Sequence, residues 1–311
     1  MGAVSHAVVP RVGFGQTGRM PELPDVSLYV QRARERLQGQ VLRRVRLLNP
    51  FVLRTAVPPL AQCEGRRVLD VQRLGKRVVL VLEGGRWLVI HLMIAGRLRW
   101  QAPAAKPPGR ISLAVFEFEA GQLVLTEAGT RRRAALHCLD SAEALAALDA
   151  GGIDVLAADA AAFIARLRRE NHTLKRALTD PRLFSGIGNA YSDEILHRAR
   201  LSPLALSQSL PEADAARLHA AAQAVLAEWT ARLAQQWPGW PQQVTAFHPE
   251  MAVHGRYGQP CPVCGSPVQR IVYAENEANY CARCQTGGRL LADRALSKLL
   301  KASWPKTIDD L

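Results

Sequence analysis

Apolar residues between positions 26 and 37 recur at the spacing of one helix face. They are Val26, Tyr29, Val30, Ala33 and Leu37. Gly39 follows them, and glycine commonly ends a helix because it adopts the left-handed backbone conformation without strain. The pattern therefore predicts a helix over residues 26–37.

Short runs rich in Val and Leu follow this helix and are separated by glycine or proline. Such runs between turn residues predict β-strands. The expected strands are Val41–Leu48, Arg66–Arg73, Val78–Glu83, Trp87–Leu92, Ile111–Glu119, Gln122–Thr126 and Ala134–His137. A β-sandwich or barrel of about 130 residues accommodates them.

Strand patterns disappear beyond Ser141–Ala158, where the composition turns to Ala, Asp and Gly. We place a domain boundary there and expect the second half to be helical. The expected helical segments are Ala160–Arg169, Leu174–Leu178, Tyr191–Ala199, Pro211–Gln235, a short one near Val244–Ala252 after an interruption at Trp237–Trp240, and a last helix over Arg289–Lys301.

The composition narrows the class of partner. The chain has 311 residues, of which 48% are hydrophobic, and 40 Lys plus Arg exceed 27 Asp plus Glu. No uncharged apolar run approaches the roughly 20 residues that span a bilayer, and no signal-peptide pattern opens the chain. We therefore expect a cytosolic protein without a membrane partner. The excess of arginine indicates an anionic polymer as the partner, because the guanidinium group grips phosphate.

Four cysteines near the C-terminus have the spacing of a metal site. Two Cys-x2-Cys pairs are separated by sixteen residues, and they consist of Cys261, Cys264, Cys281 and Cys284. Two such knuckles joined by a hairpin supply the four soft ligands of tetrahedral zinc, so we expect one structural Zn²⁺ per chain. Cys63 and Cys138 lie in strand or turn context, and we expect them to be small buried residues without a partner nearby.

Two further motifs are compatible with phosphate binding. The glycine-containing segment at residues 185–191 places Asn189 at a helix start, where backbone amides attract anions, although an ordinary helix turn also contains glycines. Arg131, Arg132 and Arg133 follow Gly129 in a loop between strands. Such a loop clamps phosphates or enters a groove, and its alternative is a solvated charge run. The basic net charge favours nucleic acid.

The segment at residues 20–25 reads Met-Pro-Glu-Leu-Pro-Asp. By itself it is a turn before a helix. It also closely resembles the opening of the formamidopyrimidine-DNA glycosylase and endonuclease VIII family. Residues 91–96 resemble that family's strand and turn, residues 186–194 its helix-two-turn-helix signature, and the four cysteines its zinc-finger hairpin. The resemblance covers residues 20–285 in the family's own order.

The resemblance implies an α+β multidomain fold. It has an N-terminal β-sandwich with an N-terminal helix, a helical helix-two-turn-helix domain and a C-terminal zinc-finger β-hairpin. The expected divisions are a disordered extension or misassigned start at 1–19, a catalytic β-sandwich domain at 20–150, a DNA-binding helical domain at 151–255, a zinc finger at 256–286 and a helical tail at 287–311.

The resemblance also implies a bifunctional glycosylase and abasic-site lyase that excises oxidised bases from damaged DNA. Pro21 is then the nucleophile, which requires a free nitrogen and hence a start at Met20 or removal of residues 1–20. Glu22 shuttles protons and Lys76 binds a phosphate beside the lesion. We further expect a monomer in the nucleoid-associated cytoplasm.

Other positions are implied to bind DNA. They are His91, Ile94, Arg131, Arg132, Lys175 and Asn189. Ile94 is an apolar wedge that fills the gap left by the extruded base, and Arg131 pairs with the orphaned base. The chain departs from the family at Arg133, which replaces an aromatic wedge, and at Asn276, which replaces a hairpin arginine.

The sequence is compatible with three functions. The favoured one is an endonuclease VIII-like glycosylase that acts on oxidised pyrimidines, ring-opened purines or abasic sites. It is favoured because the connection over Phe247–Arg256 is too short for the loop that closes over 8-oxoguanine in the formamidopyrimidine branch. The first alternative is a non-catalytic DNA-binding protein in which Pro21 is not exposed. The second, a zinc-ribbon protein that binds RNA, explains the charge and cysteines but not the segment at residues 20–25.

Overall fold

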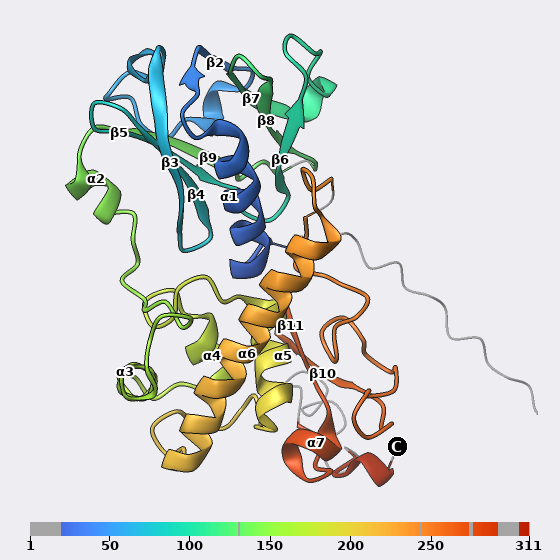
Figure 1. Ribbon diagram of the computed structural model, residues 1–311. Coiled ribbons are helices and arrows are strands. Elements are labelled where there is room, and N and C mark those ends of the chain that lie inside the picture. The colour runs from blue at the N-terminus through green and yellow to red at the C-terminus, as the bar shows by residue number, and fades with distance from the viewer. Residues whose placement is uncertain (1–19, 130, 243, 274–275, 292–304, 311) are drawn as a thin grey trace, which may run out of the picture.

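The computed structural model (Figure 1) describes residues 20–310, except 130, 243, 274–275 and 292–304. Its first element is the helix α1 (Leu23–Leu37). This helix begins three residues before the apolar pattern because Glu22 and Asp25 form a capping box and Pro24 occupies the first turn. Its apolar face joins the core of the β-sandwich.

Two antiparallel sheets form the N-terminal domain. One has the order β1 (Val41–Leu42), β3 (Arg66–Leu74), β4 (Arg77–Leu82), β5 (Arg86–His91) and β9 (Ala135–Leu139). The other has the order β2 (Arg44–Leu47), β7 (Ser112–Glu117), β8 (Gln122–Glu127) and β6 (Gly96–Gln101). Buried Val and Leu side chains from both sheets share one core, which confirms the predicted sandwich.

Two strand predictions were wrong in detail. The run expected as one strand over Val41–Leu48 is two strands, because the chain passes from one sheet to the other at Arg43. The strand β6 was not predicted. Its arginines, Arg97 and Arg99, interrupt the apolar pattern, and Leu98 is the residue of this strand that lies in the core.

The second domain consists of short helices around a long one. They are α3 (Ala160–Leu167), α4 (Leu174–Thr179), α5 (Asn189–Ala199) and α6 (Glu212–Gln236). The short helix α2 (Ala142–Ala146) precedes them and packs against the outer face of the sandwich sheet, where Ala144 and Leu145 meet Val79 and Val89. Figure 1 shows α6 rising from this domain to α1 of the sandwich. Arg32 donates to the carbonyls of Ala234 and Trp237 there, so the two domains are joined at the end of α6.

The helical segment expected near Val244–Ala252 was wrong. This stretch is extended and turned, because its apolar residues go to different cores. Val244 packs in the sandwich core, whereas Ala246 and Met251 pack in the helical core. The stretch therefore crosses the seam between the domains.

The C-terminal part is a hairpin of β10 (Gln269–Tyr273) and β11 (Asn276–Tyr280), followed by α7 (Ala282–Thr286). The last helix expected over Arg289–Lys301 falls largely outside the described residues. Residues 305–310 return to the segment that follows α7, where the Leu290 N–H donates to the Lys306 carbonyl at 2.9 Å. Along the described chain, no helix is both long and apolar enough to cross a bilayer.

The prediction for Cys63 and Cys138 was half right. Both residues are fully buried, but their Sγ atoms lie 3.2 Å apart. The short 3-10 helix over Leu60–Cys63 packs against the sheet that contains β9, and this non-local contact brings the two thiols together.

Candidate active site and zinc centre

Pro21 and Glu22 lie buried at the seam between the two domains. The next residue, Leu23, donates its N–H to the Gly186 carbonyl at 2.9 Å and packs its side chain in the helical core. Helix α1 therefore packs in the sandwich core along most of its length, whereas its first residue packs in the core of the helical domain. This double attachment fixes where Pro21 lies.

The Glu22 carboxylate lies at the N-terminus of α5. It accepts N–H groups from Gly188 at 2.6 Å, Ala190 at 2.8 Å and Tyr191 at 3.3 Å. A helix N-terminus has unpaired N–H groups and a positive end, so it favours a carboxylate. Glu22 is consequently held in place by backbone of the glycine-containing turn.

Lys76 approaches the same carboxylate from the turn between β3 and β4. A Cβ atom placed on Gly188 would lie 2.5 Å from both the Glu22 carboxyl carbon and Lys76 Nζ. Burial raises the pKa of Glu22, and the positive charge of Lys76 partly offsets this effect. Burial also lowers the pKa of Lys76, against the attraction of Glu22 and Asp25. The pKa values of this carboxyl and this amine are thus shifted toward each other, which makes proton exchange easier than it is for exposed groups.

Two other predicted residues face this centre. His91 ends β5, and burial together with the charges of Arg77 and Lys76 lowers its pKa to about 4. Lys175 lies on α4, and its charge acts on Lys76. His91 is therefore a neutral hydrogen-bonding group beside two cations.

The remaining N-terminal candidates lie on loops. Ile94 is half-buried in the turn between β5 and β6. Arg131 and Arg132 are exposed after β8, and the Arg132 guanidinium donates to the Arg110 carbonyl at 2.6 Å. Arg133 in the same loop is exposed, while its N–H donates to the Glu127 carboxylate at 2.9 Å. The side chain of Asn276 is outside the described part of the chain.

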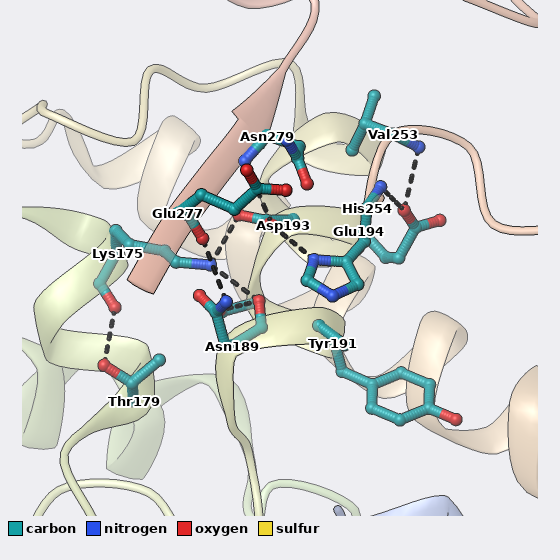
Figure 2. A network of polar contacts seen from close by, with 12 residues as sticks. Lys175, Thr179, Asn189, Tyr191, Asp193, Glu194, Val253, His254, Glu277 and Asn279 are labelled. Atoms are coloured by element: carbon teal, nitrogen blue, oxygen red, sulfur yellow. Dashed lines mark hydrogen bonds and ion pairs between the residues drawn. The ribbon is translucent and has the colours of Figure 1, made fainter. Parts of the chain in front are cut away.

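Figure 2 shows a buried polar network that connects the helical domain to the zinc hairpin. The fully buried Asp193 carboxylate pairs with Lys175 and accepts from His254 Nδ1 at 2.8 Å and from the Asn279 N–H at 3.1 Å. Lys175 Nζ also donates to the Asn189 carbonyl at 2.6 Å. The Asn189 amide donates to the Glu277 carbonyl at 2.9 Å. Lys175 and Asn189 thus tie α4, α5 and β11 together.

Sequence reasoning did not identify Glu194, His254 or Asn279 as parts of this assembly. The Glu194 carboxylate accepts the N–H groups of residues 252–254 at 2.7 to 2.9 Å, and Asn279 Oδ1 accepts from Gly255 at 2.7 Å. Two adjacent acids on the buried α5 were the available signal, because buried carboxylates need partners.

The four sulfurs of the C-terminal cysteines form one cluster. All lie within 4.8 Å of one another, with Cys261 and Cys284 3.9 Å apart and Cys264 and Cys281 3.4 Å apart. A zinc ion about 2.3 Å from each of four tetrahedral sulfurs separates them by about 3.8 Å, so the cluster fits that ion. The protein fills every coordination position, and the zinc is structural.

A histidine of the helical domain contacts this centre. His197 lies in the last turn of α5, and its Nε2 lies 3.3 Å from Cys261 Sγ. Burial and two neighbouring arginines lower its pKa to about 4, so the ring is neutral. It connects the metal centre to the helix whose other end holds Glu22.

Replacing Cys281 by Ser should remove zinc and weaken DNA binding together. A buried zinc site that loses one thiolate loses most of its affinity, and the hairpin that it folds then loses its shape. Metal content by emission spectrometry and affinity for an abasic-site duplex would measure both effects. Cys138→Ser is the matched control, and a Cys281 variant with full metal content would refute the site.

Comparison with known proteins agrees with this architecture. Family models match the formamidopyrimidine-DNA glycosylase N-terminal domain over residues 20–136, its H2TH domain over 152–235, and the zinc finger found in FPG and IleRS over 258–287. A formamidopyrimidine-DNA glycosylase of Thermus thermophilus is 37% identical over 279 residues, covering 86% of this chain and all of the relative. An uncharacterised formamidopyrimidine-DNA glycosylase-like protein of Mycobacterium tuberculosis is 41% identical over 155 residues, covering 50% of this chain and 95% of the relative.

Solved structures give the same result. The crystal structure of MutM (Fpg) from Thermus thermophilus has a TM-score of 0.71 at 34% identity, covering 85% of this chain and 98% of its own. Lactococcus lactis Fpg in complex with abasic-site DNA shares the fold, with a TM-score of 0.74 at 23% identity over 85% of this chain and 99% of its own. The chain therefore belongs to the formamidopyrimidine-DNA glycosylase family and is a DNA glycosylase of base excision repair.

Proposed function

We propose that this glycosylase also cleaves the DNA strand, using the nitrogen of an N-terminal Pro21. The observation that carries the proposal is the buried Pro21–Glu22 start, held against the N-terminus of α5 beside Lys76. A secondary amine is a strong nucleophile when it is unprotonated, and the iminium that it forms with a sugar carbon withdraws electrons. Borohydride, which reduces an iminium to a stable amine, tests this chemistry directly.

We propose the following bond changes. The Pro21 lone pair attacks C1′ of the damaged nucleotide, the bond from C1′ to the base breaks, and the amine proton leaves. Opening of the sugar gives the iminium, which makes the C2′ proton acidic. Loss of that proton breaks the C3′–O bond, and a second elimination breaks the C5′–O bond. The products are the free base, two strand ends that carry phosphate and an unsaturated five-carbon sugar remnant, which water releases from Pro21 by hydrolysing the iminium.

Glu22 and Lys76 supply the proton transfers and charge that these steps require. The raised pKa of Glu22 makes its carboxyl a proton donor toward the departing base or the sugar oxygen. Once it has lost the proton, the carboxylate is stabilised by the N–H groups of Gly188 and Ala190. Lys76 faces the same point and neutralises a flanking phosphate.

The proposed partner is damaged DNA. The net charge of +13 provides the attraction for a polyanion, and His91, Lys76 and Lys175 gather beside the reacting centre. The Lactococcus lactis relatives were solved with Fapy-dG, an oxidised pyrimidine and an abasic site in DNA. We propose the same classes of lesion for this chain, acting as a monomer in the nucleoid-associated cytoplasm.

The connection from Phe247 to Arg256 supports a preference among these lesions. Its second half is fixed, because Glu194 accepts three consecutive N–H groups and Asn279 accepts the N–H of Gly255. This leaves little free chain to close over a large purine such as 8-oxoguanine. We therefore place the protein on the endonuclease VIII-like side of the family, with oxidised pyrimidines and abasic sites as its better substrates.

Single-turnover rates should be at least about tenfold higher on an oxidised pyrimidine or an abasic site than on 8-oxoguanine paired with cytosine. A damaged pyrimidine stacks poorly, so its extrusion costs less than that of a stacked purine. The exposed Arg133 is no aromatic wedge, which extends the preference to lesions in distorted or single-stranded DNA. Matched oligonucleotides in duplex and single-stranded form provide the comparison. A clear preference for duplex 8-oxoguanine paired with cytosine would overturn the assignment.

A further inference from the structure

A histidine behind the start of α1 takes no part in the proposed chemistry. His248 lies on the stretch that crosses the domain seam, and its side chain is buried. Its ring stacks on Trp229 of α6, with the ring centroids 4.9 Å apart and the planes at 27°. The stacked ring is therefore fixed in direction, and its Nε2 points toward Asp25.

Asp25 is the residue that His248 faces. Its carboxylate is fully buried in the first turn of α1, and Oδ2 accepts the Glu22 N–H at 2.9 Å. The other oxygen, Oδ1, lies 3.5 Å from His248 Nε2. Within the described part of the chain, neither of these two atoms has a hydrogen-bond partner.

Buried polar atoms without partners are rare in native proteins, so a facing pair calls for an explanation. Among the described residues, no other basic nitrogen comes within 4.0 Å of the Asp25 carboxylate. The Thr245 and Tyr191 hydroxyls at the same seam are also unpaired within the described chain. Among the described residues, the seam thus has several hydrogen-bonding groups without partners behind the start of α1.

We propose that His248 is a positioning residue for the nucleophile. Its Nε2 edge, 3.5 Å from Asp25 Oδ1, directs that carboxylate, and Asp25 Oδ2 accepts the Glu22 N–H. That N–H belongs to the peptide that joins Pro21 to Glu22, so the pair fixes the direction of the Pro21 nitrogen. The inference rests on the proposed function, since it assumes that Pro21 is the nucleophile.

Two polar variants of similar size test the contact. In His248→Gln the amide nitrogen reaches the position of Nε2, whereas in His248→Asn the side chain is too short. We expect the Asn variant to form the borohydride-trapped complex with abasic-site DNA at least about tenfold more slowly than the unchanged protein, and the Gln variant to stay within about threefold of it. His219→Gln is the matched control, because His219 packs against Phe163 at a tilted angle and bonds to the Ala158 carbonyl away from the seam.

A measurement of DNA affinity distinguishes a misplaced nucleophile from a misfolded protein. Binding to a duplex with a non-cleavable tetrahydrofuran site should stay within about twofold for both His248 variants, since the contact acts on the nucleophile's direction. Equal trapping rates for the Asn and Gln variants would overturn the inference, and so would a rate loss matched by an equal loss of affinity. If the unchanged protein itself forms no trapped complex, the proposed function fails first, and the inference fails with it.

Discussion

A protein that begins at Pro21 should form a borohydride-trapped complex with abasic-site DNA, and a form that retains Met20 should form at least about 100-fold less. In the longer form the Pro21 nitrogen is a tertiary amide, whose lone pair is delocalised into the carbonyl. It therefore cannot attack C1′. Pro21→Gly should also reduce trapping strongly, because a primary amine on a more flexible residue is less well placed.

Intact mass and N-terminal sequencing would establish which form is present, and gel analysis after borohydride treatment would measure the complex. Pro211→Gly, at the exposed start of α6, is the matched control. Undiminished trapping by the Met20 form or by Pro21→Gly would move the nucleophile elsewhere, and the buried Lys76 would become the first candidate.

Local patterns predicted much of the fold. The helical spacing of α1 and the Val- and Leu-rich strands are properties of a few consecutive residues, and the structure has these elements close to the predicted bounds. The crossing between sheets at Arg43 was not predictable in this way, because an edge between two sheets leaves no change in hydrophobic pattern. The strand β6 was hidden for a related reason, since Arg97 and Arg99 extend from a face of the sheet that apolar residues do not mark.

The candidate site was likewise predictable where the signal is local in sequence, and it was not predictable where it depends on packing. The zinc ligands were predictable because Cys-x2-Cys fixes each pair within one turn of chain. The contact between Cys63 and Cys138 was not, because 75 residues separate the two thiols and only the packed sandwich brings them together. A resemblance indicated Pro21, Glu22 and Lys76, but it did not show that the α5 N-terminus holds the carboxylate.

Histidines were the residues most easily missed. His248 lies in the segment near Val244–Ala252 that was expected to be a helix, and His254 lies two residues beyond it. Their importance comes from what they face, namely Asp25 and Asp193, which lie on two other helices. Charge complementarity between segments far apart in sequence becomes visible only after the chain has folded.

Gly188→Ala should abolish most of the activity without a change of charge. The added Cβ would lie 2.5 Å from the Glu22 carboxyl carbon and 2.5 Å from Lys76 Nζ, far inside van der Waals contact. Lys76 has a flexible side chain, but Glu22 is fixed by three N–H donors, so one or both groups must leave their positions. Displacement of a catalytic group by about 1 Å costs about 100-fold in rate, and we expect a loss of that order in trapping and in base excision.

Gly239→Ala is the matched control, because nothing lies within 4 Å of the added methyl group and the glycine has no left-handed backbone that would be strained. Melting temperature and zinc content should be compared for both variants, since Gly188 and the metal centre sit near opposite ends of α5. A Gly188→Ala protein that keeps its zinc and its fold but loses trapping would locate the defect at Glu22 and Lys76. A variant that traps at the normal rate would show that the chemistry does not depend on the close approach of these two groups, and the proton-transfer role given to Glu22 would have to be abandoned.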